Sequence, residues 1–350
     1  MAQHRLAQRE RKEKLGGTMP QSTPEKTTKT PARLSKSRVI KTMTKLAGKL
    51  EEDSSTGLPT IKIAGGFLSI DVNEEMGGLC VLGYWGGTVC FDPDRQPLRM
   101  EVNDLNGGGI SGNLVAEPCG SSDMHTHLRV FAPPYLPSAA TNAQLKSIVA
   151  GYAAEMSAVF ARLDEQFPEH RSKPRKGSGL KPVSPHYFSE AYGVSVVGMW
   201  RVYERATRLA MIGTPIHVVD NKNGAVSILI NEHTITIESA RDGSGDIELS
   251  LVTPSGRCAC DLDALVRWAE FMNDDQYVYS ARIEAVNLDG GQEQDLVLVT
   301  TARIPTKWGY TDEQLDWQLS TLVSQLVRAG EAFYRTFNPT RVMRYIDRAA

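Results

Sequence analysis

The sequence has no long apolar segment, because no run of apolar residues in its 350 approaches the roughly 18 that cross a bilayer. We therefore expect no transmembrane helix and no membrane partner. The first residues, MAQHRLAQRERKEKLGG, are charged and lack the apolar core of a secretory signal, so we expect a cytoplasmic location. Cysteine is scarce and odd in number, which favours reduced thiols over a disulfide framework. The five are Cys80, Cys90, Cys119, Cys258 and Cys260.

Motifs for catalysis and cofactor binding are also missing. There is no CxxC pair and no HExxH helix. The segment NGGGISG (106–112) lacks the Gly-Lys-Ser/Thr ending of a phosphate loop. We expect no catalytic residue, no cofactor and no metal. One segment keeps an alternative open: CGSSDMHTH (119–127) holds Cys119, Asp123, His125 and His127. His125 and His127 share one side of a strand, and the CAC segment at 258–260 can complete a zinc site. Cys119 with His125 can also form a thiol nucleophile pair, although acidic neighbours raise a thiol pKa.

Charge is distributed unevenly along the chain. Residues 1–50 hold 13 Lys and Arg and 3 Asp and Glu, a net of +10, whereas the whole chain carries −2, so the remainder carries −12. Residues 1–32 contain too few apolar residues to offset the entropy of ordering, and we expect a disordered basic arm. This arm and the basic Pro/Gly/Ser linker at 169–185 can contact nucleic acid, or the arm can remain solvated or dock on the acidic body.

The remaining residues predict helices and short β-strands. Helical spacing begins after Ser35, and TIKIAGGFLSIDV, GLCVLGYWGGTVCFD, QPLRMEV, NLVAEP and THLRVFAPPYLP read as strands. The glycine cluster at 106–113 reads as a loop or hairpin. A long helix follows from Thr141 to Phe167. After the linker, the pattern is a helix, strands, the short helix DLDALVRWAEFMN, two strands and a long helix from Thr311 to Phe337.

The two long helices share a sequence pattern at an offset of 170 residues. TNAQL (141–145) and TDEQL (311–315) both predict a capping box, in which Thr and Gln satisfy each other's free backbone N–H groups. Seven positions of one helix face then correspond: Leu145, Val149, Tyr152, Met156, Phe160, Leu163 and Phe167 with Leu315, Leu319, Leu322, Leu326, Gly330, Phe333 and Phe337. RVIKTMTKLA (38–47) and RVYERATRLA (201–210) share five of ten residues. We therefore expect an α+β fold built as a tandem repeat, with modules at 33–168 and 186–340 and a tail at 341–350.

The second module resembles the YbjN family, small bacterial domains with a type III secretion chaperone-like fold. The resemblance covers roughly 196–338 and rests on element order and apolar pattern in AVSILINEHTITIES, DIELSLVT, DLDALVRWAEFMN, VYSARIEAV, DLVLVTTARIP and TDEQLDWQLSTLVSQLVRAGEAFYRTF. The first module departs from this pattern, because no middle helix separates its strands. The resemblance implies a module that binds protein segments or regulates, and it supplies no catalytic residues.

The function that we expect is non-enzymatic binding. The two modules would form an intrachain pseudo-dimer, a monomer or weak homo-oligomer, that holds a protein or peptide partner. Trp308 and Tyr310 precede the last helix and are the candidate exposed contacts with that partner. Trp200 and Trp268 read as core residues. A nucleic-acid-associated protein using the basic arm and linker, and a metal or thiol enzyme at Cys119 and His125, are the alternatives.

Overall fold

The computed structural model describes most of the chain between residues 31 and 337. The described ranges are 31–52, 57–73, 77–90, 96–109, 112–118, 125–170, 197–210, 216–220, 225–230, 232–241, 245–255, 261–275, 278–286 and 295–337. Residues 1–30 of the expected basic arm (1–32), residues 171–185 of the expected linker (169–185) and the tail (341–350) lie outside these ranges. The end of the arm is ordered, because Ala32 pairs with Ala140, and the linker begins in a short 3-10 helix. We call 31–170 the first half and 197–337 the second half.

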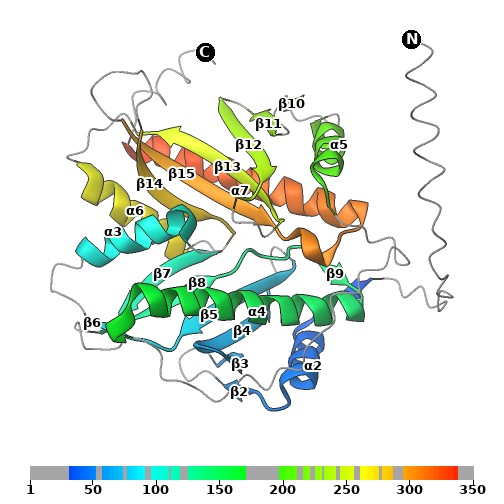
Figure 1. The fold of residues 1–350 in the computed structure, drawn as a ribbon. Coiled ribbons are helices and arrows are strands. Elements are labelled where there is room, and N and C mark those ends of the chain that lie inside the picture. Colours follow the sequence, from blue (N-terminus) through cyan, green and yellow to red (C-terminus); the bar gives the residue numbers. More distant parts are fainter. Residues whose placement is uncertain are drawn as a thin grey trace, which may run out of the picture.

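Helices and antiparallel sheets alternate in both halves, so the expected α+β class is confirmed (Figure 1). The first half contains β1 (Ala32–Arg33), α2 (Lys36–Ala47), β2 (Glu51–Glu52), β3 (Pro59–Ile63), β4 (Gly66–Val72), β5 (Leu79–Trp85), β6 (Val89–Cys90), α3 (Gln96–Asp104), the π-helix η1 (Leu105–Gly109), β7 (Asn113–Pro118), β8 (His125–Phe131), β9 (Ala139–Ala140), α4 (Asn142–Gln166) and the 3-10 helix η2 (Pro168–His170). The second half contains α5 (Met199–Ala210), β10 (Ile216–Asp220), β11 (Val226–Ile230), β12 (His233–Ser239), β13 (Ile247–Pro254), α6 (Leu262–Asp275), β14 (Ser280–Val286), β15 (Asp295–Ile304), the 3-10 helix η6 (Thr306–Trp308) and α7 (Asp312–Phe337).

The two large sheets have matching strand orders. The first runs β2-β3-β4-β5-β8, with β7 and the short β6 also paired to β8, and the second runs β10-β11-β12-β13-β15-β14. All neighbouring strands are antiparallel. In the second sheet, β15 lies between β13, which precedes α6, and β14, which follows α6. In the first sheet, β8 lies in the same way between β5, which comes before α3, and β7, which comes after it. In Figure 1, α4 lies in front of the first sheet, whereas α7 lies behind the second.

The first half contains a middle helix that the sequence analysis missed. QPLRMEV, predicted as a strand, lies in α3, and the glycine cluster after it begins with the π-helix η1 instead of an ordinary loop. Leu98, Met100 and Val102 alternate in sequence as in a strand. In the helix, Leu98 and Val102 lie four residues apart on one face, and both are buried. The expectation that no middle helix separates these strands was therefore wrong.

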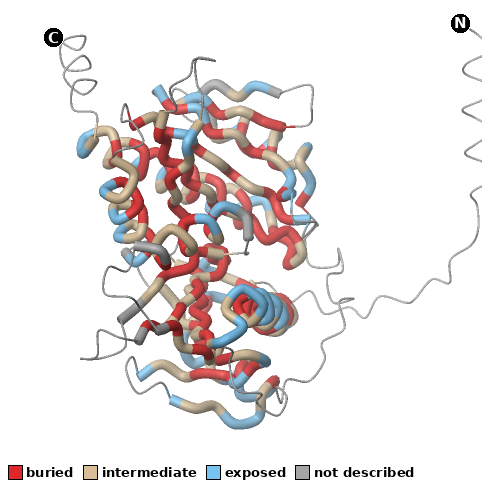
Figure 2. The backbone as a smooth tube through the Cα atoms, turned by 60° about the vertical axis from the view of Figure 1, so that its left-hand side comes forward, coloured by how far each residue is buried: buried red, intermediate tan, exposed pale blue. Residues whose placement is uncertain are grey.

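Both long helices begin as predicted. At α4, Gln144 N donates to Thr141 Oγ1 (3.1 Å) and Thr141 N donates to Gln144 Oε1 (2.9 Å). Thr311 and Gln314 make the same pair at α7 (3.2 and 2.8 Å). Residues of the two predicted stripes are buried, as Figure 2 shows along the helix faces, and only Phe167 and Phe337 at the ends are partly exposed. Gly330 belongs to the stripe because a β-carbon there would lie 2.9 Å from Leu251 on β13.

The arginine shared by RVIKTMTKLA and RVYERATRLA connects each half's first helix to the start of its long helix. Arg38 on α2 donates to Ala140 O (2.9 Å) and to Asn142 Oδ1 (2.9 Å). Arg201 on α5 donates to Tyr310 O (2.8 Å) and to Asp312 Oδ1 (2.9 Å). The acceptors are again 170 residues apart, so the sequence match corresponds to a shared contact.

No helix in the described part of the chain is long and apolar enough to cross a membrane.

Candidate binding surface and the buried contact between the halves

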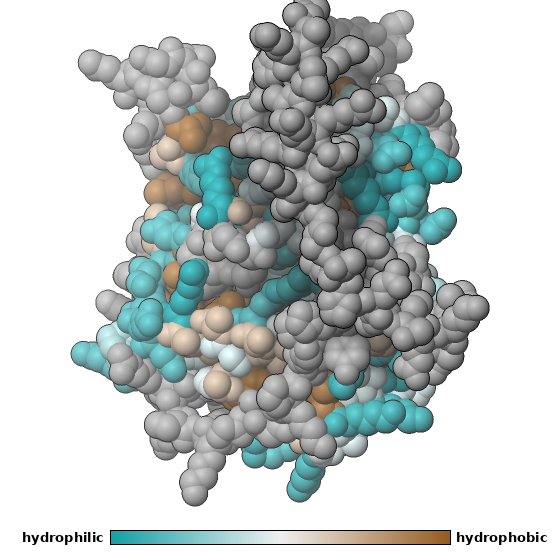
Figure 3. All heavy atoms as spheres, turned by 45° about the vertical axis from the view of Figure 1, so that its right-hand side comes forward, coloured by the Kyte–Doolittle hydropathy of each residue, from teal (hydrophilic) through white to brown (hydrophobic). Residues whose placement is uncertain are grey.

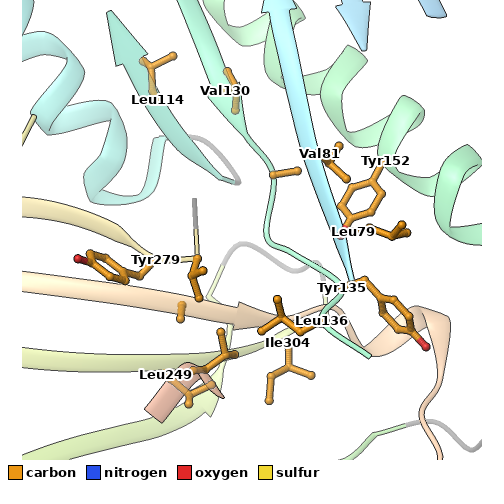
Figure 4. Packing of buried hydrophobic residues seen from close by; sticks show 14 of the residues in the cluster. Leu79, Val81, Leu114, Val130, Tyr135, Leu136, Tyr152, Leu249, Tyr279 and Ile304 are labelled. Carbon is orange, nitrogen blue, oxygen red and sulfur yellow. The ribbon is translucent and has the colours of Figure 1, made fainter. Parts of the chain in front are cut away.

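The segment between β15 and α7 is buried against the first half. Trp308 is 1% exposed and Tyr310 is fully buried. The Trp308 ring lies 4.3 Å from that of Tyr152 and 6.0 Å from that of Tyr135, and the rings of Tyr310 and Tyr135 are 5.3 Å apart. Figure 4 shows Tyr135 and Tyr152 in the same cluster as Ile304 at the end of β15. The prediction that Trp308 and Tyr310 form an exposed partner contact was therefore wrong: the partner is the chain's own first half.

Two reciprocal hydrogen bonds cross this contact. Gln144 Nε2 donates to Gly309 O (3.5 Å), and Gln314 Nε2 donates to Ala139 O (2.6 Å). Both donors and both acceptors are 170 residues apart, as expected when a two-fold axis relates two copies of one surface. The glutamines of the capping boxes thus also connect the halves.

The residues at the middle helices make a second contact between the halves, at matching positions but with different hydrogen bonds. Asn103 on α3 donates to Ile283 O (3.0 Å) and accepts from Ile283 N (2.8 Å) on β14. Asn113 on β7 donates to Asn273 O (3.0 Å) at the end of α6. Asn103 and Asn273 differ by 170 residues, and so do Asn113 and Ile283. Sequence reasoning did not single out these asparagines, because only their tertiary partners distinguish them from surface residues.

One contact has no counterpart at the 170-residue offset. Gln318 on α7 is fully buried, accepts from Leu136 N (2.9 Å) and donates to Pro134 O (3.0 Å). The residue 170 positions earlier, Ile148, cannot form such bonds. An ion pair joins Lys307 to Glu155 at the edge of the same contact. Together these contacts attach α7 and the segment before it to the first half.

The side of the second sheet that faces away from α7 is what we call the open side. Gly330 of α7 faces Leu251 and Thr253 of β13, so the alternate residues Glu248, Ser250 and Val252 point to the open side. Large apolar side chains are exposed there: Val252 (49%) on β13, Leu229 (38%) on β11 and Val219 (46%) on β10. Such exposed apolar side chains on a sheet are typical of contact surfaces. In the view of Figure 3, apolar patches lie beside hydrophilic ones among the described residues.

A cleft of about 410 Å³ lies where the open side meets the first half. Its floor is formed by β13, β15 and β14, and its wall includes Gly107 of η1, Gly112 and Asn113 at the start of β7, and Phe131 and Pro133 at and after the end of β8. Tyr279, which precedes β14, closes one side and is labelled in Figure 4. Clefts of this size hold a small molecule or a few side chains of a partner.

A row of hydroxyl groups crosses the floor of the cleft. Ser250, Thr301 and Ser280 are register partners on β13, β15 and β14, and all three line the cleft. In the first sheet the corresponding row across β5, β8 and β7 is Leu82, Phe131 and Asn113. The first sheet thus has the same strand order without a row of hydroxyl groups, so the fold alone does not explain the hydroxyl row in the cleft.

Three arginines and three glutamates surround the hydroxyl row. Arg282 Nε donates to Glu284 Oε1 (2.6 Å), Arg303 Nη2 lies 3.1 Å from Glu248 Oε2, and Arg241 Nη2 lies 2.9 Å from Glu238 Oε1. The side chains of Arg282 and Arg303 are 14% and 12% exposed, whereas Arg241 is 86% exposed. The formal charges in the cleft therefore balance, and two of the guanidinium groups are held largely away from bulk water.

The strand containing Ser280, Arg282 and Glu284 was predicted correctly from alternating polar and apolar residues in SARIEAV. That pattern indicates one polar side but does not show that this side borders a cleft. The signal was present as three polar residues at a spacing of two, and only the fold places them opposite the first half.

The metal and thiol candidates are largely outside the described residues. Cys119, Asp123, Cys258 and Cys260 fall there, and β8 contains His125 and His127, with His125 paired in register to Cys90. Within the part of the chain that is described, no three His, Cys, Asp or Glu side chains are grouped as metal ligands. Cys80 is described, and burial, followed by the nearby charge of Asp71, raises the pKa of its thiol to about 12.

Trp200 was predicted as core, and this was wrong. It is 72% exposed on α5 and packs beside Tyr203, with ring centroids 5.6 Å apart. Trp268 on α6 is partly buried and packs against the core, with its ring 5.2 Å from that of Phe333, so that prediction is confirmed in part.

No protein-family model, curated protein or solved structure matches this chain.

Proposed function

We propose that the chain is a tandem repeat of two related α+β modules, paired as an intrachain pseudo-dimer in the cytoplasm. Equal strand order, one reciprocal pair of hydrogen bonds and the paired arginines Arg38 and Arg201 support this proposal. The presence of α3 in the first half removes the difference in element order between the modules. The element order of the second half also agrees with the proposed resemblance to the YbjN family.

The function that we propose is non-enzymatic: the protein holds a segment of a protein partner, as a chaperone-like or regulatory module. The observation that carries this proposal is the open side of the second sheet. This side exposes Val219, Leu229 and Val252 and continues into the cleft. Burying these three side chains against a partner would stabilise a complex, since apolar burial contributes roughly 25 cal/mol per Å².

Photo-crosslinking in cells tests this function. A photoreactive amino acid at Val252, on the open side, should give a defined crosslinked product with a protein segment. The matched control is Phe271 on α6, which is more exposed (66%) but does not line the cleft. Equal products from both positions, or a product from Phe271 alone, would contradict the proposal.

A further inference from the structure

The cleft contains hydrogen-bond donors that the described residues do not satisfy. Ser280 is 7% exposed, and its buried Oγ has no hydrogen-bond partner in the described part of the chain. The Arg282 guanidinium uses Nε for Glu284, and the same part of the chain supplies no hydrogen bond to its two Nη groups. Buried polar groups of native proteins are nearly always paired, so the buried Ser280 Oγ, next to the Nη groups of Arg282 on the same strand, favours a bound acceptor. The two residues lie on the same side of β14, two positions apart.

The position of Arg282 is fixed from two directions. Glu284 holds Nε at 2.6 Å, and a β-carbon at Gly107 of η1 would lie 3.4 Å from Arg282 Cδ. A contact at this distance is an ordinary van der Waals contact, so η1 packs directly beside the arginine stem. A guanidinium held in this way can present its Nη groups without a further loss of side-chain entropy. Its planar pair of donors matches the two oxygens of a carboxylate.

Apolar and charged positions adjoin on the floor. Val252, Val299 and Arg282 are register partners on β13, β15 and β14, so exposed Val252 lies in the same row as Arg282. The open side then continues over β12 to Leu229 on β11. Four strand spacings separate β14 from β11, a distance of about 19 Å that about six extended residues can span. A segment on this surface thus passes through the cleft and continues along the sheet.

We propose that the cleft binds an Asp or Glu side chain within an extended segment of the partner protein, with Arg282 and Ser280 donating to its carboxylate. Val252 and Leu229 contact apolar side chains of the same segment. Thr301, in the middle of the hydroxyl row, supplies a further donor. This inference rests on the proposed function and specifies the chemistry of the segment.

Pools of short random peptides, about nine residues long to cover the open side, test the proposal on the immobilised full-length protein. One pool contains Asp and Glu, a second replaces them with Asn and Gln, and each pool has a free or an amidated C-terminus. The protein should enrich peptides with Asp or Glu from both the free and the amidated pools. Arg282→Gln should weaken their binding about tenfold or more, since hydrogen bonds to a charged group are among the strongest.

Glu284→Gln distinguishes binding from folding. This change removes a competing negative charge, while the amide oxygen can still accept from Arg282 Nε and keep the guanidinium in place, so acidic peptides should bind more tightly, although it breaks the same ion pair as Arg282→Gln. Arg267→Gln, which removes an exposed ion pair with Asp263 on α6, is the matched control and should change nothing. Weaker binding by Glu284→Gln would overturn the proposal, because it would show that the Arg282–Glu284 ion pair supports the fold and that Arg282 does not bind the peptide.

The other results separate this inference from the proposed function. Peptides enriched without regard to Asp or Glu, with binding lost in Val252→Lys but not in Arg282→Gln, would overturn the carboxylate proposal and leave the function standing. Enrichment confined to peptides with a free C-terminus would also overturn it. So would peptide binding that is insensitive to Arg282→Gln and is lost only when inorganic phosphate is added. If no peptide binds to the unmodified protein, the proposed function fails together with the inference.

Discussion

Replacement of Gln318 by alanine removes one of the side chains that attach α7 to the first half. Gln318 is fully buried, and its amide satisfies both Leu136 N–H (2.9 Å) and Pro134 C=O (3.0 Å). In Gln318→Ala these two buried backbone groups lose their partners. Each unsatisfied group costs about 1–3 kcal/mol, so we expect a loss of about 3 kcal/mol in the free energy of unfolding.

Guanidinium denaturation followed by circular dichroism measures this loss. Gln318→Glu should cost at least as much, because its carboxylate can still accept from Leu136 N–H but lies fully buried against Pro134 O with no hydrogen to donate. Ser324→Ala, at an exposed position of the same helix, is the control and should cost a few tenths of a kcal/mol at most. A loss in Gln318→Ala no larger than that of the control would refute the reasoning that this side chain connects the halves.

Three further predictions concern the core, the arm and an ion pair. Leu326→Asp should abolish cooperative unfolding of the second half, because it buries an unpaired carboxylate at a fully buried site, while Gln325→Asp should fold; equal melts would show that the stripe is not core. Deletion of residues 1–30 should leave the melting temperature nearly unchanged, and a drop of many degrees would show that the arm docks on the acidic body. The hydrogen bond from Arg201 keeps the pKa of Asp312 below its ordinary value of 3.8. A lowered carboxylate pKa adds stability above the unfolded-state pKa and loses it as pH falls through the folded-state pKa. Asp312→Asn should therefore lower the melting temperature slightly at about pH 7 and not at about pH 2; a shift that is equal at both pH values would contradict the ion-pair account.

Local signals were sufficient to predict the long helices. Thr141 and Thr311 carry their capping boxes within four residues of sequence, and the stripes beginning at Leu145 and Leu315 repeat at helical spacing, so no distant residue was needed. The strands β3 to β5 and β11 to β15 follow equally from alternation and turn residues.

Burial decided by distant residues could not be predicted. Trp308 and Tyr310 follow a strand and precede a helix, as exposed loop residues often do, and only Tyr135 and Tyr152 of the first half enclose them. α3 looked like a strand because nine residues fit either period, and the contact of Asn103 with Ile283, 180 residues away, supports the helix instead.

The cleft could not be predicted from the sequence, again because distant residues form it. Ser280, Arg282 and Thr301 are ordinary residues of half-buried strands in the sequence. They come together only through the pairing of β14 with β15, and the cleft exists because the first half lies opposite them.

Methyl NMR of the full chain with the peptide most enriched on it tests most directly whether the open side is the binding surface. The account predicts that the peptide shifts the methyl resonances of Val252, Leu229 and Val219, and leaves those of Val159 on α4 and Val327 on α7 unchanged. Shifts confined to α4 and α7, with Val252 and Leu229 unaffected, would contradict it.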